Sequence, residues 1–341
     1  MINKMILKSF LYLFFALFIT KTVFAADVGN VLIQQRHHVV CGIDREYKTL
    51  AYQKEGSWQG LDADICRAIA AAVIGDAESF KLLPVAKENI GGALNSGKID
   101  IMLGHQTLSA AEEASQNIIP VDTIYFDKVI FASRKTTDAQ SMHDFANAKV
   151  CVLRNSNDLG LLKAYIEKNA LSLKTLELPA LSAAKEAFYL RRCDLISGGE
   201  IFIKSIVKDL KSEDMPEILP ESIGILPIKA YSSPLSPRLN TSFRWIINAL
   251  KLAASEDISS QNIDTFKASK NPSIRNLLGL DPALWNKMGL STNWAEEYIK
   301  TYGNYNQLID RHLTTDKSSE TDFVPNNLLE KGGLITSVPF I

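Results

Sequence analysis

Polar side chains that could bind a small solute follow two apolar runs, which end at Leu103 and Leu153. The candidates are His105, Gln106, Thr107 and Ser109 in the first loop, and Arg154, Asn155, Ser156 and Asn157 in the second. An imidazole, a guanidinium, amides and hydroxyls supply hydrogen-bond donors and acceptors, and Arg154 adds a fixed cation for an acidic group. These residue types predict recognition of a small polar solute.

Three further candidates follow other predicted strands. Tyr47 and Tyr52 lie in the loop after the strand at 38–43, and Glu200 follows the strand at 193–196. Ligands of open α/β sheets bind at the carboxyl ends of the strands, where these loops are expected. The two tyrosines could stack on a ligand or merely cover the lobe, and Glu200 offers an anion.

The same residues give little support to catalysis. The sequence has no Ser–His–Asp order, no metal-ligand cluster and no phosphate-binding loop. His105 and Glu112 could form an acid–base pair. A single histidine on a loop near carboxylates is, however, more often a surface residue. We therefore expect a protein that is not an enzyme and that uses no cofactor or metal.

The elements that position these loops begin with a strand, a helix and a strand. Apolar runs at 38–42 and 80–85 flank a helix in which Ile65, Ile69, Ala72 and Val73 form one stripe. Gly60 supplies the turn before the helix, Asp62 is the expected N-cap, and Gly75 ends it. Such a unit implies a parallel sheet.

The pattern then repeats, which predicts a second lobe. Apolar strands at 148–153, 173–178 and 193–196 alternate with helical segments. The run 126–133 leads out of the first lobe, and Pro234 and Pro237 mark the return. We predict an α/β clamshell with a hinge that the chain crosses twice. Its parts are 26–134 (lobe 1, first part), 135–228 (lobe 2) and 229–341 (the return crossing and the C-terminal helices of lobe 1). Trp285 and Trp294 are expected in the core.

The N-terminal segment has the pattern of a secretory signal. Lys4 and Lys8 precede an apolar run at 10–20, and Val23 and Ala25 are small enough for signal peptidase. The alternative is a membrane anchor, but the run is about half the roughly 20 residues that a span requires. We expect residues 1–25 to be removed after Ala25 and the mature chain to be periplasmic.

Composition excludes two classes of partner. The chain of 341 residues is 46% hydrophobic and 22% charged, ordinary globular material for two lobes. The predicted mature chain has 34 basic and 38 acidic residues, a net charge near −4. Because no basic block occurs, neither nucleic acid nor a membrane surface is an expected partner.

Four cysteines fit an oxidising compartment. Cys41, Cys66, Cys151 and Cys193 form an even set, which indicates disulfides and allows three pairings. Sequential pairing would keep each bridge within one lobe. Metal ligation is the alternative, but no Cys-x-x-Cys pair exists.

Several short strings resemble the periplasmic solute-binding proteins of polar amino-acid ABC transporters (bacterial extracellular solute-binding proteins, family 3), and most closely the general L-amino-acid-binding branch. They are Gly60–Asp64 with Cys66–Val73, Asn95–Ile101, Arg192–Leu195, Asn271–Gly279, Gly289–Ala295, Gly303–Tyr305 and Gly332–Leu334. The resemblance covers most of the mature chain. It implies a type II periplasmic-binding-protein clamshell, bridges 41–66 and 151–193, a monomer, and an inner-membrane ABC permease as partner.

The residues that grip an amino acid in that family do not match. The family uses an arginine after the strand at 99–103 for the ligand carboxylate, and its Thr-Leu-Ser-Arg pattern would place that arginine at Ala110. The aspartate that holds the ligand ammonium falls at Gly199, next to Glu200. The turn at 154–157 replaces a Thr-Gly-Thr-type anion cradle. The scaffold residues match the family's pattern, whereas the ligand-binding residues do not.

Three hypotheses follow for the function. The protein binds an amino acid, with Arg154 as the new cation and Glu200 as the new anion. Alternatively, it binds another small solute through His105, Gln106, Arg154 and Asn155. In the third hypothesis it has lost transport and acts as a sensor or a protein-interaction module. Some relatives with this fold are dehydratases, which leaves the His105–Glu112 pair as a fourth alternative.

Overall fold

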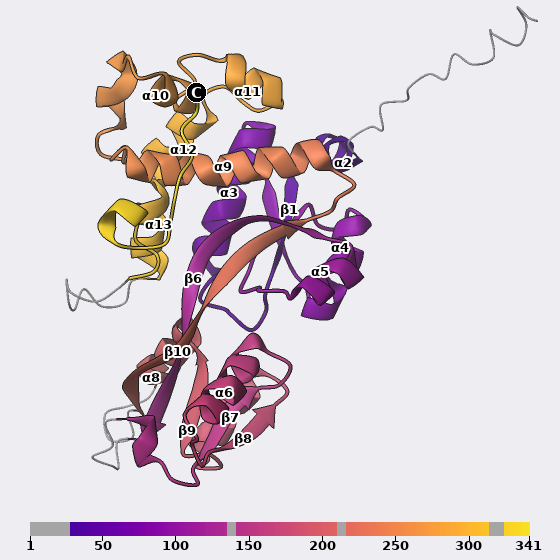
Figure 1. Ribbon diagram of the computed structural model, residues 1–341. Helices are drawn as coiled ribbons and strands as arrows, with labels where there is room; N and C mark the ends of the chain where they lie inside the picture. Colours follow the sequence, from indigo (N-terminus) through magenta and orange to yellow (C-terminus); the bar gives the residue numbers. More distant parts are fainter. Residues whose placement is uncertain (1–27, 135–140, 210–215, 314–323) are drawn as a thin grey trace, which may run out of the picture.

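The computed structural model describes residues 28–134, 141–209, 216–313 and 324–341. A single mixed sheet runs through the molecule with the strand order β4-β1-β5-β10-β6-β9-β7-β8 (Figure 1). Its strands are β1 (Val39–Ile43), β4 (Phe80–Pro84), β5 (Ile101–Met102), β6 (Ile119–Arg134), β7 (Lys149–Leu153), β8 (Lys174–Leu178), β9 (Leu195–Gly199) and β10 (Pro216–Ser232). A separate hairpin pairs β2 (Tyr52–Lys54) with β3 (Ser57–Gln59).

Two long antiparallel strands connect the lobes. β6 has 16 residues and β10 has 17, and they pair from Arg134–Pro216 at one end to Ile119–Ser232 at the other. One half of this ribbon joins β5, β1 and β4 in the larger lobe, and the other half joins β9, β7 and β8 in the smaller lobe (Figure 1). The predicted two-lobed α/β fold is therefore confirmed. The lobe boundaries at 134 and 228 stay a prediction, since both strands run through the junction.

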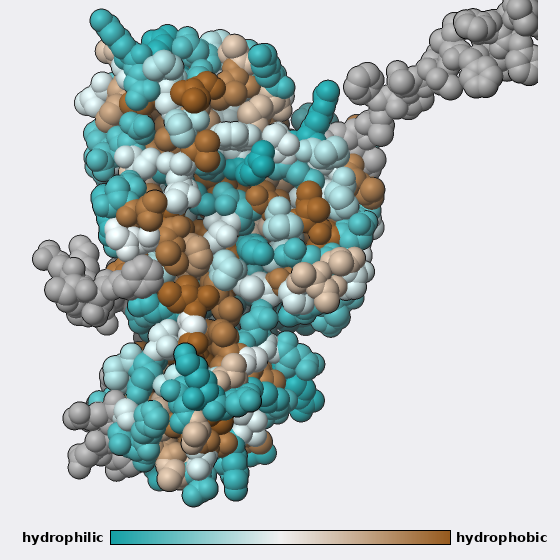
Figure 2. Space-filling model, viewed as in Figure 1, coloured by the Kyte–Doolittle hydropathy of each residue, from teal (hydrophilic) through white to brown (hydrophobic). Residues whose placement is uncertain are grey.

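Helices cover both faces of the sheet. The larger lobe contains α2 (Val28–Arg36), α3 (Leu61–Ile74), η1 (Lys87–Asn89), α4 (Ile90–Asn95) and α5 (Ala110–Gln116). The smaller lobe contains η2 (Met142–Asp144), α6 (Asn157–Lys168), α7 (Leu181–Tyr189) and α8 (Glu200–Asp209). Space-filling atoms show hydrophobic side chains gathered where the larger lobe meets the smaller one (Figure 2).

The C-terminal third packs on the larger lobe (Figure 1). It consists of α9 (Pro237–Ser255), η3 (Ile263–Ala268), α10 (Pro272–Leu277), α11 (Ala283–Met288), α12 (Trp294–Tyr302), α13 (Tyr305–His312) and η4 (Leu329–Lys331). Trp285 and Trp294 are buried and meet edge to face, with ring centroids 5.5 Å apart. Their predicted place in the core is therefore observed. They stabilise the C-terminal third through burial of large apolar surfaces.

The start of α3 differs from the prediction. The N-cap is Gly60, and Asp62 lies inside the first turn with its side chain buried. Gly60 has a φ of 112°, and a side chain there would collide with the main chain of Leu50. The Asp62 N–H donates to the Leu50 carbonyl at 3.0 Å, so the preceding loop supplies the cap. The prediction that Asp62 is the N-cap is wrong, because only glycine adopts this turn without strain.

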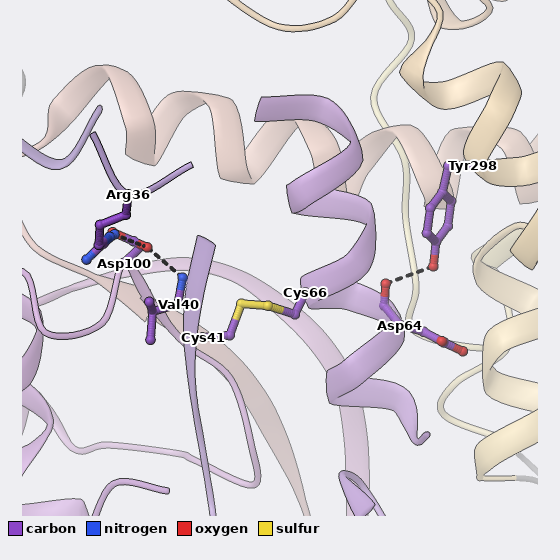
Figure 3. Close-up of a disulfide and its surroundings, with 7 residues drawn as sticks. All are labelled: Arg36, Val40, Cys41, Asp64, Cys66, Asp100 and Tyr298. Atoms are coloured by element: carbon purple, nitrogen blue, oxygen red, sulfur yellow. Dashed lines mark hydrogen bonds and ion pairs between the residues drawn. A yellow bond between two sulfur atoms is a disulfide. The ribbon is translucent and has the colours of Figure 1, made fainter. Parts of the chain in front are cut away.

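Both disulfides join the pairs that the resemblance implied. Cys41 of β1 bonds to Cys66 of α3, with Cα atoms 6.1 Å apart (Figure 3). Cys151 of β7 bonds to Cys193, with Cα atoms 5.7 Å apart. In Figure 3 the Tyr298 hydroxyl also donates to the Asp64 carbonyl at 2.8 Å, which ties α12 to α3. Each bridge thus holds a helix or loop to the sheet of its own lobe.

The predicted signal segment 1–25 lies outside the described residues. Among the helices that the structure describes, none has the length and apolar character needed to span a membrane.

Candidate functional site

A cavity of about 650 Å³ lies between the two lobes. It is bordered by the loops at the carboxyl ends of β1, β4 and β5 on one side and of β7 and β8 on the other, the position at which open α/β sheets bind ligands. Its walls include the predicted residues Tyr47, His105, Gln106, Thr107, Arg154, Asn155, Ser156 and Asn157. The fold therefore brings together residues from loops more than a hundred positions apart.

The remaining predicted residues lie elsewhere. Tyr52 and Glu200 line a second cavity of about 450 Å³, where Glu200 forms an ion pair with Lys204 at 2.9 Å. Ser109 caps α5, because its hydroxyl accepts the Glu112 N–H at 3.3 Å. Glu112 pairs with Lys87 at 2.7 Å. His105 and Glu112 do not form the acid–base pair considered above, because His105 contacts Asp127 and Glu112 contacts Lys87.

The turn after β7 is fixed by its own hydrogen bonds. The Ser156 hydroxyl accepts the Leu159 N–H at 3.1 Å, which caps α6, and donates to the Leu153 carbonyl at 2.8 Å. Asn155 has a φ of 56°, a left-handed conformation that asparagine tolerates better than most residues. This turn directs Arg154 and Asn155 along the edge of the cavity.

Among the residues that the structure describes, hydrogen bonds cross from one lobe to the other. The side-chain amide of Asn157 donates to the Thr107 carbonyl. The Leu181 N–H of the smaller lobe donates to the Glu46 carboxylate of the larger lobe at 3.2 Å. These bonds hold the two lobes against each other beside the cavity, which Asn157, Thr107 and Glu46 line.

His105 is the central polar residue between the lobes. Its ring stacks on Tyr47 with centroids 3.9 Å apart and an angle of 9° between the planes. Its Nε2 lies 2.6 Å from Asp127 Oδ2, and both side chains are buried. Burial lowers the pKa of His105. The hydrogen bond that the ring donates to Asp127 and the nearby charges of Asp127, Asp158 and Asp44 outweigh this effect, so the pKa is raised overall. The raised pKa favours the protonated form of His105 in this pair.

Sequence reasoning missed the carboxylates around this histidine, which we call the acidic floor (Asp44, Asp127 and Asp158). Asp44 follows β1 and accepts the Gln106 side-chain amide at 2.8 Å. Asp158 lies in the first turn of α6, and burial raises its pKa to about 6. These two carried a signal, because each follows a predicted strand. Asp127 carried none, since it lies inside the long strand β6.

Two exposed arginines form what we call the basic rim (Arg45 and Arg154). Arg45 belongs to the loop after β1 and Arg154 to the turn after β7, so one comes from each lobe. Within the described ranges neither is joined to a carboxylate by an ion pair. The cavity thus has buried negative charge from both lobes and exposed positive charge from both lobes.

A two-lobed α/β fold with a polar cavity at its junction and two connecting strands defines a hinged binding protein. Residues 39–315 match the model of the bacterial extracellular solute-binding proteins, family 3. The chain belongs to this family, and it is a solute-binding protein of the type that serves amino-acid ABC transporters.

Characterised relatives match over nearly the whole chain. The general L-amino acid-binding periplasmic protein AapJ of Rhizobium johnstonii is 27% identical over 90% of this chain and 91% of its own. The glutamate/glutamine/aspartate/asparagine-binding protein BztA of Rhodobacter capsulatus is 26% identical over 90% and 92%. The family resemblance inferred from the sequence is therefore confirmed.

Among solved structures, a periplasmic binding protein of an ABC transporter from Brucella ovis, with glutathione bound, has a TM-score of 0.82. It is 25% identical and covers 91% of this chain and 98% of its own. The ancestral amino acid-binding protein AncCDT-1 has a TM-score of 0.54 at 17% identity and covers 67% of this chain, which shows a likeness of fold alone.

Proposed function

We propose that the protein captures an amino-acid-type solute that carries an ammonium group and at least one carboxylate. One observation carries the proposal: each lobe contributes to the cavity both a carboxyl group and an arginine that forms no ion pair with the residues the structure describes. Asp44 and Arg45 come from the larger lobe, and Asp158 and Arg154 come from the smaller lobe. A zwitterion that contacts both lobes stabilises the closed arrangement through its differential affinity for that state.

Opposite charges suit opposite ends of such a solute. A buried ammonium requires a nearby anion, which the acidic floor supplies. A carboxylate gains charge-assisted hydrogen bonds from guanidinium groups, which the basic rim supplies. Arg45 and Arg154 thereby replace the family's arginine, whose position is occupied by Ala110 in this chain. Asp44 and Asp158 replace the family's aspartate, whose position is occupied by Gly199. Tyr47, Gln106, Thr107, Asn155 and Ser156 complete the proposed contacts.

The size of the cavity suits a small-molecule solute. A volume of about 650 Å³ lies in the middle of the range of roughly 300–1,000 Å³ for small-molecule sites. Glutathione, seen in the Brucella structure, is a tripeptide with one ammonium group and two carboxylates. Glutamate and glutamine appear in the name of the Rhodobacter relative. These three compounds are the first probes to test.

We assign the mature chain to the periplasm, after removal of residues 1–25, where it delivers its solute to an inner-membrane ABC permease. Membership of an extracellular family and the periplasmic relatives support this placement. The protein acts as a monomeric carrier and performs no catalysis. The comparisons do not favour the sensor and protein-docking hypotheses.

The test begins with the solute that the purified mature protein carries. Denaturation followed by mass spectrometry of the released small molecules is expected to yield a compound with an amino group. Calorimetry then measures glutamate, glutamine and glutathione beside their N-acetyl forms, in which the ammonium is absent. We expect N-acetylation to abolish detectable binding.

Arginine variants test the other end of the solute. Each lost charge-assisted hydrogen bond is worth about 1.5–3 kcal/mol, so Arg154→Ala with Arg45→Ala is expected to weaken binding at least roughly a hundredfold. Arg238→Ala, an exposed arginine of α9, is the matched control and should bind as the wild type does. Equal binding of N-acetylated solutes, or full affinity in the double variant, would contradict the proposal.

A further inference from the structure

His105 and Asp127 separate the two cavities at the junction of the lobes. His105 lines the larger cavity and Asp127 lines the smaller one, and their side chains meet at 2.6 Å. The exposed fraction is 8% for the His105 side chain and 2% for that of Asp127. A titratable ring is therefore hydrogen-bonded to a buried carboxyl group between the two cavities.

The main chain of β9 makes room for this pair. A Cβ atom at Gly199 would collide with Asp127 Oδ2 and would lie 3.3 Å from His105 Nε2. Asp127 thus fills space that any side chain at position 199 would occupy. The neighbouring strand β6, which pairs with β9 through Val129 and Gly199, provides the carboxylate instead.

The groups facing His105 come from several elements and are mostly acidic. Asp44 and Tyr47 come from the loop after β1, Tyr125 and Asp127 from β6, Asp158 from α6, and Asp62 from α3. The Tyr125 hydroxyl is buried and has no hydrogen-bond partner. Burial raises the pKa of Asp62 to about 7 and that of Asp158 to about 6. Because these carboxyl groups outnumber the one imidazole ring, a further cation among them favours their ionised forms.

We infer that His105 is an internal cation that competes with the solute's amino group for the acidic floor. This inference rests on the proposed function and adds a residue that sets selectivity for amino-bearing solutes. In the empty protein the imidazolium neutralises part of the floor. When a solute ammonium arrives, two cations share the same carboxylates. The imidazolium then releases its proton to solvent, because the amine of the solute is a stronger base than imidazole and keeps its own proton.

The consequence is a dependence of binding on pH. The amino group of the solute remains charged up to about pH 8, while His105 loses its proton as the pH rises. Competition therefore weakens with rising pH, and affinity for amino-bearing solutes increases. The floor carboxyls lose protons over part of the same range, so the wild type must be compared with a variant that lacks only the imidazole charge.

His105→Gln is that variant, because an amide still donates a hydrogen bond to Asp127 but carries no charge. We expect it to bind glutathione or glutamate at about pH 7 roughly ten- to hundredfold more tightly than the wild type. His312→Gln is the matched control, since His312 forms an equally buried pair with Asp64 at 2.7 Å, outside the larger cavity. It should lower the melting temperature without changing solute affinity.

Carbon-13 NMR of the imidazole rings tests the wild type directly and does not depend on whether a variant folds. His105 should be charged in the solute-free protein at about pH 7 and neutral in the protein saturated with solute. The signals of the His312 ring should be the same in both samples. Unchanged or weaker binding in His105→Gln, or an imidazolium that persists in the saturated protein, overturns the inference. If the protein also binds N-acetylated solutes as tightly as the free ones, the proposed function fails together with this inference. If it binds only the free solutes, the proposed function stands and this inference alone fails.

Discussion

Asn157 in the smaller lobe donates a hydrogen bond from its side-chain amide to the main-chain carbonyl of Thr107 in the larger lobe. Both residues line the cavity. The bond joins the first residue of α6 to the loop after β5, so it connects elements of different lobes. One side chain thus contributes both to the cavity wall and to the contact between the lobes.

Asn157→Ala is expected to shift the solute-free protein toward open arrangements. A neutral hydrogen bond contributes about 1 kcal/mol, which corresponds to a shift of roughly fivefold in the ratio of closed to open molecules. Small-angle X-ray scattering should show a larger radius of gyration without solute, and calorimetry a weaker affinity by up to that factor. Asn169→Ala, at the other end of α6, removes a bond to Tyr165 within the helix and is the control. An unchanged radius of gyration would show that closure does not depend on this bond.

Asp62→Asn is expected to stabilise the protein at neutral pH and not at acid pH. Burial raises the pKa of Asp62 to about 7, whereas an unfolded chain has the ordinary value of 3.8. Between these values the folded state keeps a proton that the unfolded state has lost, so the free energy of unfolding falls as the pH rises. Asparagine does not ionise, so the variant does not lose this stability as the pH rises.

Urea unfolding of wild type and Asp62→Asn at about pH 4 and about pH 8 measures the effect. The variant should gain stability only at the higher pH. Asp76→Asn is a control of opposite sign, because hydrogen bonds from the Glu78 N–H and the Ser79 hydroxyl lower the pKa of Asp76. The stability that the ionised Asp76 carboxylate gains from these hydrogen bonds is present at neutral pH and is lost as the pH falls through the folded-state pKa of Asp76. A gain for Asp62→Asn that is equal at both pH values would show that its charge is not involved.

Asp64→Asn is expected to loosen the C-terminal helices. The buried Asp64 carboxylate contacts Arg67 at 2.5 Å, Arg311 at 3.1 Å and His312 at 2.7 Å, and so joins α3 to α13. Removing one partner of a buried ion pair costs about 3–5 kcal/mol, because the other charge stays unpaired. Thermal unfolding should show a clear loss. Asp281→Asn, which breaks an exposed pair with Arg275, should change little, and equal losses would contradict the assigned role.

Removal of either disulfide is expected to lower stability without redirecting the fold. The bridges close loops with sequence separations of 25 and 42 residues. In the chain-entropy model, loops of this size correspond to roughly 3.5–4 kcal/mol each. Paired Cys→Ser substitutions with thermal unfolding measure the effect, and peptide mapping without reductant should recover 41–66 and 151–193. A bridge between lobes, such as Cys41 to Cys151, would be incompatible with the structure.

Local pattern was enough for the scaffold. The apolar run after His38, the helix up to Gly75 and the strand beginning at Phe80 appear as a parallel unit, because side-chain periodicity and glycine stops act within a few residues. The family and the disulfide pairing followed from short strings around such elements. Even so, Asp62 was misassigned as a cap, since the turn depends on Leu50, a residue of the preceding loop.

The chemistry of the cleft was decided by the order of strands in the sheet. β6 lies between β10 and β9, and this placement sets Asp127 against His105 and beside Gly199. No spacing in the sequence indicates that contact, because it joins residues from separate strands and loops. Glu200 follows β9 directly, yet it faces the second cavity and pairs with Lys204. Sequence therefore determined which charges the loops carry, and tertiary structure decided which of them meet, because proximity between strands depends on sheet topology and not on distance along the chain.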